Sequence, residues 1–342
     1  MGDRRGVEAI SAALSSEEGE ILASSILGNT DSESILATLE ALCETSLSSG
    51  LKEMLFCNLG VGATFGLRLS DGCRITLKAH PPGRSSNFLQ AVQRVQGHLR
   101  RRGFPAPRPI LDPVPFGNGV ATVDEFLDEG EAAEGHDPAV RGSMARTLAC
   151  LIELAREVSD VEALSQGWNW PAREDLWPPP HNALFDFEAT AAGAGWIDEI
   201  AACSKELADE FQGPIVIGHA DWSVDQMRFE GNAVSAVYDW DSLRLDKEVV
   251  FVGIAASNFA ATWRGETPNP PSPEEARLFV ADFEAARGEP FSEDEREALF
   301  GTVVYAAAYM ARCEHALDSG RKNVRGSFRE ILPSYKAAFS SS

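Results

Sequence analysis

Residues 219–226 read His-Ala-Asp-Trp-Ser-Val-Asp-Gln, and residues 239–241 read Asp-Trp-Asp. The apolar run at residues 215–217 precedes the first segment, which places that segment in a loop at the end of a strand. Between the two segments, residues 227–238 predict a β-hairpin around a Glu-Gly-Asn turn. Because a hairpin returns the chain to its starting point, we expect Asp239 to lie close to Asp221 and Gln226.

Two carboxylates and an amide around one point suit phosphoryl transfer. One Asp can orient an attacking hydroxyl and accept its proton, while oxygen ligands hold a Mg²⁺ ion that bridges the phosphates. Aspartates also form turns, so Asp221 and Asp225 could be turn residues without a chemical role. The ordered set of acid, amide and acid in one segment favours the chemical interpretation.

This segment resembles the catalytic loop and metal segment of the aminoglycoside phosphotransferase and choline kinase superfamily, which is related to the protein kinases. The family pattern H-G-D-x-x-x-x-N, a hairpin and I-D-W is matched at His219, Asp221 and Asp239. The resemblance implies that Asp221 is the catalytic base, that His219 supports the loop and that Asp239 is the main Mg²⁺ ligand. Gln226 replaces the family's Asn and is still an expected ligand, with Asp225 as a further candidate.

Outside this segment the chain divides into a β-rich part and a helical part. The segments that read as strands are residues 54–59, 64–69, 74–79, 110–114 and 120–126. The segments that read as helices are residues 87–102, 138–158, part of 185–211, 293–317 and 324–339. Ser272 and Ser292 each begin a capping box. With the resemblance, these patterns predict an α+β, two-lobed protein-kinase-like fold with a small β-rich N-lobe and a larger, mainly helical C-lobe.

Three domains are expected. Residues 1–50 form an N-terminal helical extension, since apolar residues recur at three- and four-residue steps from residue 7 to residue 50. This extension could cap the first lobe or contribute to an oligomer. Residues 51–127 form the nucleotide-binding N-lobe, and residues 128–342 form the C-lobe with the catalytic loop and the substrate site.

Candidate nucleotide-binding residues lie in the N-lobe. Gly60 and Gly62 stand between two strands, where glycines let backbone N–H groups approach phosphates, although a plain hairpin turn would explain them too. Lys78 lies on the third strand, where the resemblance places the lysine that reaches the α- and β-phosphates. Glu125 and Leu127 match the family's strand leading into the hinge, whose backbone would hold adenine.

Other positions depart from the family pattern. The helix expected to supply a Glu partner for Lys78 offers only glutamines, at positions 90, 93 and 96. Residues 245–247 and 251–253 stand where the family has G-D-P and D-L-A, so the family's second Asp is absent. These departures indicate a divergent branch.

Composition excludes several classes of protein. The 342 residues have a formal net charge of −22, which repels nucleic acids and anionic membrane surfaces. No apolar run approaches the ~20 residues that span a bilayer, and the first residues lack a signal peptide pattern, so we expect a cytoplasmic location. Six scattered cysteines favour neither a disulfide framework nor a zinc site.

The sequence thus predicts a kinase that uses ATP and Mg²⁺ to phosphorylate a hydroxyl of a small molecule, with antibiotic resistance or metabolite phosphorylation as its context. The alternative is a degenerate kinase-fold protein that binds a nucleotide or a partner without turnover. The oligomeric state is left open.

The acceptor is not identified by the sequence. Acidic residues in the linker at residues 128–137 predict an acceptor bearing an amine, unless these residues only solubilise the surface. Residues 159–181, which contain three tryptophans, and the helix with Arg312, Glu314 and His315 could contact the acceptor, but core packing is the favoured role for both.

Overall fold

The computed structural model describes residues 4–166, 175–263, 265, 267–320 and 325–339. The chain forms two compact units. Unit 1 comprises Met1–Gly97, Pro107–Leu127 and His181–Leu184, and unit 2 comprises His98–Ala106, Asp128–Pro180 and Phe185–Ser342. The residues expected to form a helical extension therefore belong to the same unit as the β-rich lobe.

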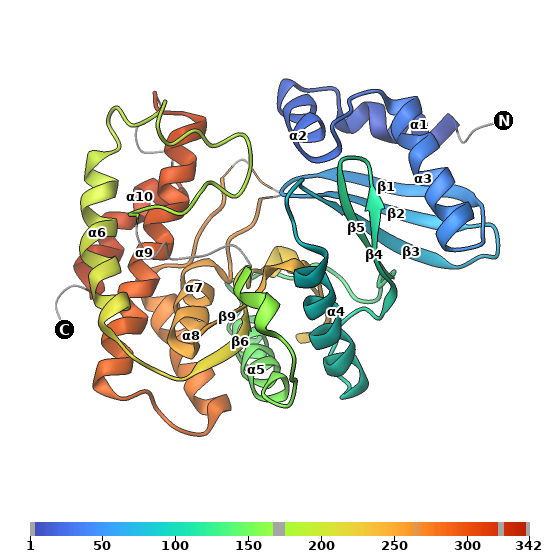
Figure 1. Ribbon diagram of the computed structural model, residues 1–342. Helices are drawn as coiled ribbons and strands as arrows, with labels where there is room; N and C mark the ends of the chain where they lie inside the picture. The colour runs from blue at the N-terminus through green and yellow to red at the C-terminus, as the bar shows by residue number, and fades with distance from the viewer. Residues whose placement is uncertain (1–3, 167–174, 264, 266, 321–324, 340–342) are drawn as a thin grey trace. The chain divides into compact units, whose positions relative to one another are not determined.

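An antiparallel five-stranded sheet forms the centre of unit 1 (Figure 1). Its strands are β1 (Leu51–Leu59), β2 (Ala63–Leu69), β3 (Arg74–His80), β4 (Pro109–Phe116) and β5 (Gly119–Glu125), in the order β1-β2-β3-β5-β4. Helix α4 (Ser86–Arg101) connects β3 to β4. The predicted apolar face of this helix is confirmed, because Leu89, Val92, Val95 and Leu99 are buried.

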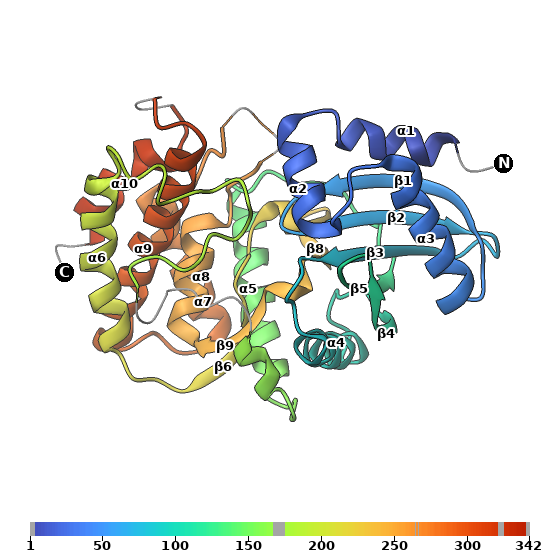
Figure 2. The ribbon, with the colours of Figure 1, turned by 45° about the horizontal axis from the view of Figure 1, so that its top comes forward.

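Three N-terminal helices cover one face of this sheet (Figure 2). They are α1 (Arg4–Ala13), α2 (Glu17–Leu27) and α3 (Ser32–Ser46). Alternate residues of the strands, such as Phe65 on β2 and Leu77 on β3, are fully buried and share one apolar core with these helices. Because side chains alternate between the two faces of a strand, Lys78 projects from the opposite face.

In the residues that the structure describes, unit 2 is mainly helical and contains two small sheets. Its helices are α5 (Pro138–Ala155), α6 (Gly195–Glu210), α7 (Glu248–Asn258), α8 (Pro273–Arg287), α9 (Glu293–Leu317) and α10 (Phe328–Phe339), with short 3₁₀ turns at Glu162–Gln166, Val224–Gln226 and Trp240–Ser242. The strands β6 (Ile215–His219) and β9 (Leu243–Lys247) form one antiparallel pair, and β7 (Met227–Glu230) and β8 (Ala233–Val237) form the other. The predicted hairpin at residues 227–238 is therefore confirmed.

One strand and one helix of unit 2 were not predicted from the sequence. Strand β9 and helix α7 occupy residues 243–258, where the sequence shows only a departure from the family pattern. Nearly every residue of α7 is buried, including Val249, Phe251 and Ile254. A helix that is apolar on all sides lacks the one-sided periodicity that identifies helices in a sequence.

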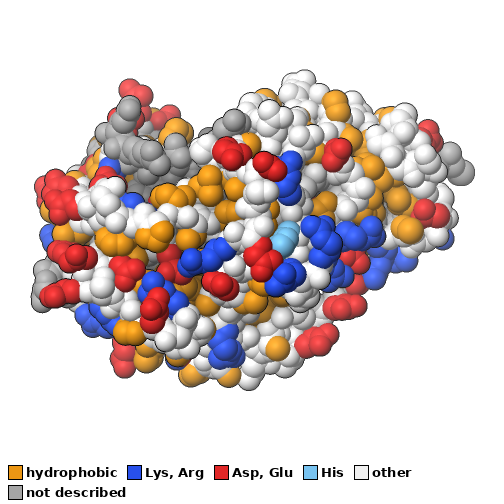
Figure 3. Space-filling view, turned by 60° about the horizontal axis from the view of Figure 1, so that its bottom comes forward, with side chains coloured by type: hydrophobic (Ala, Val, Ile, Leu, Met, Phe, Trp, Pro, Cys, Tyr) orange, Lys and Arg blue, Asp and Glu red, His pale blue; other side chains and the backbone are white. Residues whose placement is uncertain are grey.

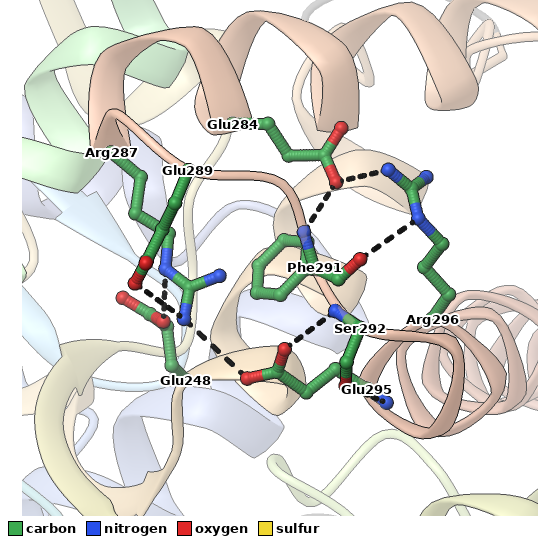
Figure 4. A network of polar contacts seen from close by, with 8 residues as sticks. All are labelled: Glu248, Glu284, Arg287, Glu289, Phe291, Ser292, Glu295 and Arg296. Atoms are coloured by element: carbon green, nitrogen blue, oxygen red, sulfur yellow. Dashed lines mark hydrogen bonds and ion pairs between the residues drawn. The ribbon is translucent and has the colours of Figure 1, made fainter.

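The ends of the helices in unit 2 are fixed by capping and by ion pairs. Both predicted capping boxes are confirmed, at Ser272 before α8 and at Ser292 before α9. Arg287, at the end of α8, lies 3.0 Å from Glu248 of α7 and 3.4 Å from Glu295 of α9 (Figure 4). This network joins three helices through one guanidinium group.

No helix within the described ranges is long and apolar enough to cross a membrane. The net charge of −22 is unevenly distributed, since Lys and Arg side chains gather on part of the face drawn in Figure 3. The net charge alone therefore does not describe the surroundings of any one site.

Candidate active site

The catalytic loop, residues 219–226, is held beside the start of β9. Strands β6 and β9 pair from Ile215 opposite Lys247 to His219 opposite Leu243. One residue further on, the backbone N–H of Ala220 donates to the carbonyl of Ser242 at 3.0 Å. The pairing therefore brings together the loop with Asp221 and the 3₁₀ turn that follows Asp239.

His219 is fully buried and contacts both the catalytic loop and the residue directly before Asp239. Its Nδ1 accepts a 3.2 Å hydrogen bond from the backbone N–H of Asp221, so Nε2 carries the proton and donates to the carbonyl of Tyr238 at 3.0 Å. The rings of Trp222 and Trp240 meet the imidazole at steep angles, with centroids 5.6 and 6.1 Å away. These contacts fit a supporting role for His219.

Gln226 lies between the two candidate acids. Its side-chain Nε2 donates to Oδ2 of Asp221 at 2.7 Å. Its backbone carbonyl accepts from the N–H of Tyr238 at 2.9 Å, one residue before Asp239. The structure thus brings Asp221, Gln226 and the start of the Asp239 turn together.

Asp239 has a left-handed backbone conformation, with φ 59° and ψ 45°. Asp tolerates this region better than most residues because its short polar side chain can form local hydrogen bonds. Here Ser242 donates its hydroxyl to Oδ2 of Asp239 at 2.8 Å and its N–H to the Asp239 carbonyl at 3.0 Å. Ser242 was not identified from the sequence, although its position three residues after an Asp is a typical turn spacing.

The residues around Asp239 fit a Mg²⁺ ion. A carboxylate and an amide carbonyl are hard oxygen ligands, and Mg²⁺ in phosphoryl-transfer sites takes one or two carboxylates and completes its shell with water and phosphate. In the described ranges, no group of three His, Cys, Asp or Glu side chains could hold a metal.

A cation and a phenol lie on the hairpin beside Asp239. The guanidinium of Arg228 lies 5.6 Å from the ring centre of Tyr238 and donates to the Met227 carbonyl at 2.9 Å. Burial raises the pKa of Tyr238, and Asp128 adds to this while Arg228 opposes it. The phenol therefore stays protonated at neutral pH.

Asp225 contacts the segment that follows α7. Its Oδ1 accepts from the hydroxyl of Thr262 at 2.9 Å, and its Oδ2 accepts from the backbone N–H of Trp263 at 2.7 Å. The metal role suggested for Asp225 remains a prediction, while the structure shows this carboxylate holding residues 262 and 263.

The candidate nucleotide residues all belong to unit 1. Lys78 is half-buried, paired in register with Thr64 on β2 and Thr122 on β5. A Cβ atom at Gly62 would lie 2.8 Å from the Ala79 carbonyl and 3.0 Å from Cε of Lys78, so Gly62 makes room for the lysine chain. A Cβ atom at Gly60 would have nothing within 4 Å.

The end of β5 carries Glu125 and Leu127. The N–H of Glu125 donates to the carbonyl of Arg108 at 2.8 Å, and the N–H of Arg108 donates back to the Glu125 carboxylate at 3.3 Å. Leu127 is half-buried at the last position of this part of unit 1. Their adenine-binding role remains a prediction.

The glutamines of α4 brace the sheet. Gln93 donates to the carbonyl of Leu111 at 2.8 Å. Gln96 donates at 2.9 Å both to the carbonyl of Pro107 and to the carboxylate of Asp124. These side chains, which stand where a Glu partner for the lysine was expected, are therefore structural.

The packing role favoured for α9 is confirmed. Arg312 is buried and donates to the hydroxyl of Thr190 at 3.1 Å and to the carbonyl of Phe187. His315 is buried against the carbonyl of Ala192 at 3.0 Å.

The tryptophan-rich segment also packs, as far as it is described. Trp177 stacks on Tyr305 of α9 with centroids 5.6 Å apart and donates to Asp198 at 2.9 Å. Trp168 and Trp170 lie outside the described residues.

Comparison with known proteins shows the family. The model of the phosphotransferase enzyme family matches residues 58–298, more than half of the chain, so the chain belongs to this family. With the kinase-like fold, this defines a small-molecule phosphotransferase of the kinase type. No curated protein sequence matches the chain.

Solved structures share the fold at low sequence identity. Amicoumacin kinase hAmiN, solved with AMP-PNP, Ca²⁺ and Ami, has a TM-score of 0.62 and 12% identity over 90% of this chain and 96% of its own. Plasmodium vivax ethanolamine kinase has a TM-score of 0.54 and 13% identity over 94% of each chain. The aminoglycoside phosphotransferase APH(4)-Ia, in a ternary complex with ADP and hygromycin B, has a TM-score of 0.53 and 11% identity over 89% and 100%.

Proposed function

We propose that this protein transfers the γ-phosphate of ATP to a hydroxyl group of a small molecule. The observation that carries the proposal is the hydrogen bond from the side chain of Gln226 to Asp221. The backbone of Gln226 is in turn bonded to Tyr238, which directly precedes Asp239. This arrangement puts a candidate proton acceptor and candidate metal ligands in one place. Family membership supports the same reaction class.

In this proposal Asp221 is the base. Its Oδ2 accepts a hydrogen bond from the side-chain amide of Gln226, which orients the carboxylate. Its Oδ1 would then receive the proton of the attacking hydroxyl. As the acceptor oxygen bonds to the γ-phosphorus, the bond from that phosphorus to the leaving ADP oxygen breaks. The brace of His219 keeps the backbone of Asp221 in place during this step.

Asp239 and Gln226 would hold Mg²⁺ through their carboxylate and amide oxygens. The ion would supply charge neutralisation on the phosphates. Lys78 would place its ammonium against the phosphates, and Gly62 would leave the space that its chain needs.

The test uses the purified chain with MgATP and a panel of hydroxyl compounds that includes aminoglycosides, macrolides, amicoumacin, ethanolamine, choline and fructosamines. The expected result is an acceptor product heavier by one phosphate, with stoichiometric ADP. Binding of ATP with no phosphorylated product from a broad acceptor panel would instead favour the alternative, a kinase-fold protein without turnover.

A further inference from the structure

The segment that follows α7 is fastened to the catalytic loop. The N–H of Val224 donates to the carbonyl of Phe259 at 2.8 Å. Asp225 accepts from the Thr262 hydroxyl at 2.9 Å and from the Trp263 N–H at 2.7 Å. Three hydrogen bonds therefore fix residues 259–263 relative to the loop that carries the proposed base.

Trp263 presents a large exposed ring from this fixed segment. The residue is 55% exposed, although Phe259, Ala260 and Ala261 are at most 2% exposed. The indole stacks on Phe328, with centroids 6.4 Å apart and an interplanar angle of 22°. Because Phe328 is fully buried, the indole has a rigid support.

Phe328 is itself held in place. Its N–H donates to Oε1 of Glu314 at 2.9 Å, and the N–H of Arg329 donates to Oε2 at 2.9 Å. Burial raises the pKa of Glu314, and these two hydrogen bonds oppose that rise. Glu314, for which the sequence favoured a packing role over contact with the acceptor, supports the residue beneath Trp263.

A single exposed tryptophan needs no functional explanation by itself. Trp263 differs because the two side-chain oxygens of Asp225, a residue of the catalytic loop, accept hydrogen bonds from its backbone N–H and from the hydroxyl of its neighbour Thr262. These two bonds and the support of Phe328 hold the residue at three points. The result is a flat, exposed aromatic ring whose backbone is bonded to the catalytic loop.

We propose that Trp263 binds the acceptor by stacking on one of its rings, and that Asp225 is the positioning residue that holds Trp263 in place. The inference rests on the proposed phosphotransferase function and narrows the acceptor to hydroxyl compounds with a ring, such as glycosides. A small acyclic amino alcohol offers no flat face to an indole. Quaternary ammonium groups are bound by cages of several aromatic rings, whereas residues 259–263 expose one.

The test compares the wild type with Trp263→Ala, Trp263→Phe and Asp225→Asn. Trp196→Ala is the matched control, because Trp196 is also an exposed tryptophan of unit 2, on α6, at 38%. The ring probes are hygromycin B, a macrolide, glucose and adenosine, and the acyclic probe is ethanolamine. Kinetics with MgATP give KM for acceptor and ATP separately, and calorimetry gives acceptor binding without ATP.

We expect Trp263→Ala to raise the KM and Kd of the best ring acceptor by about 10- to 100-fold, the usual effect of losing a stacking contact. Trp263→Phe should recover most of this loss, and Asp225→Asn should raise the acceptor KM several-fold through a less fixed indole. The ATP KM should stay within about twofold of wild type in both Trp263 variants and in Trp196→Ala.

Unchanged acceptor KM in Trp263→Ala would overturn the inference. Phosphorylation of ethanolamine without binding of any ring probe would also overturn the inference. That result would leave the proposed phosphotransferase function intact. If the wild type binds no ring probe at all, the inference is wrong whatever the turnover. A wild type that MgATP does not stabilise and that phosphorylates neither class would overturn both the inference and the proposed function.

Discussion

The side-chain amide of Gln226 donates a 2.7 Å hydrogen bond to Oδ2 of Asp221. The sequence identified both residues but assigned the amide only to the metal. In the structure the nitrogen of the same amide donates to the proposed base, and the proposed metal role would use the amide oxygen. One side chain would then serve both parts of the proposed site.

Substitutions of Gln226 test this double role. Gln226→Glu places a second carboxylate against Asp221, and like charges at hydrogen-bond distance disfavour the ionised pair. We expect turnover to fall by about 10²-fold, as when a base loses its working state. Gln226→Asn, which restores the family's shorter amide, should keep activation by Mg²⁺ at similar concentrations. Reaction rates measured across a Mg²⁺ titration give the turnover of Gln226→Glu and the Mg²⁺ activation of Gln226→Asn. Wild-type activity in Gln226→Glu would contradict the role of Gln226 in orienting Asp221.

The two glycines of the β1–β2 turn should respond differently to alanine. Gly62→Ala would push a methyl group against the Ala79 carbonyl and the Lys78 side chain, whereas the added methyl in Gly60→Ala meets no atom within 4 Å. Overpacking of this kind costs about 1–3 kcal/mol. We expect Gly62→Ala to lower Tm and weaken ATP binding, with Gly60→Ala close to wild type. Equal behaviour of the two variants in thermal shift with and without MgATP would refute this.

Glu248 makes stability depend on pH. Burial raises the pKa of its carboxyl, and the nearby Arg287 and Arg156 only partly oppose this. The folded state therefore holds a proton that the unfolded state releases between the ordinary pKa of about 4.5 and the raised value. Within that window the free energy of unfolding contributed by this group falls as pH rises. Urea unfolding at several pH values gives the free energy of unfolding of the wild type and of Glu248→Gln. The wild-type value minus the Glu248→Gln value should decline as pH rises and then level off. An increase of this difference with pH would contradict the raised pKa of Glu248.

One residue of the acidic linker pairs with the hairpin that precedes Asp239. Glu131 pairs with Phe229 of β7 through two backbone hydrogen bonds of 2.8 and 2.9 Å, and its side chain is exposed. Exposed carboxylates raise the local concentration of cations, and salt screens this over about 8–10 Å. For an amine-bearing acceptor we expect kcat/KM to fall several-fold between low salt and about 0.5 M salt. Replacing Glu129, Glu131 and Glu134 by Gln should flatten that dependence, and an unchanged slope would show that these acids only solubilise the surface.

The sequence predicted those parts of the fold whose patterns are local. The hairpin after Gln226, the capping boxes at Ser272 and Ser292 and the apolar face of α4 each follow from turn chemistry or from periodicity over a few residues. Helix α7 was missed because it is buried on all sides.

Contacts between distant segments could not be predicted. The bond from Asp225 to Trp263 spans 38 residues, and no pattern in either segment indicates the other. The packing of the helices at residues 4–46 on the sheet was left open for the same reason, since an amphipathic helix shows that it has a buried face but not what covers it.

The assignment of Asp221 as the base is the central claim, and one measurement tests it most directly. Turnover of ATP with the best acceptor is compared between wild type and Asp221→Asn, with MgATP binding followed in both by thermal shift. Asn keeps the shape and can still accept the bond from Gln226 but cannot take a proton, so we predict a loss of about 10²–10⁴-fold in kcat with nucleotide binding nearly intact. A kcat within a few-fold of wild type in Asp221→Asn would contradict the account.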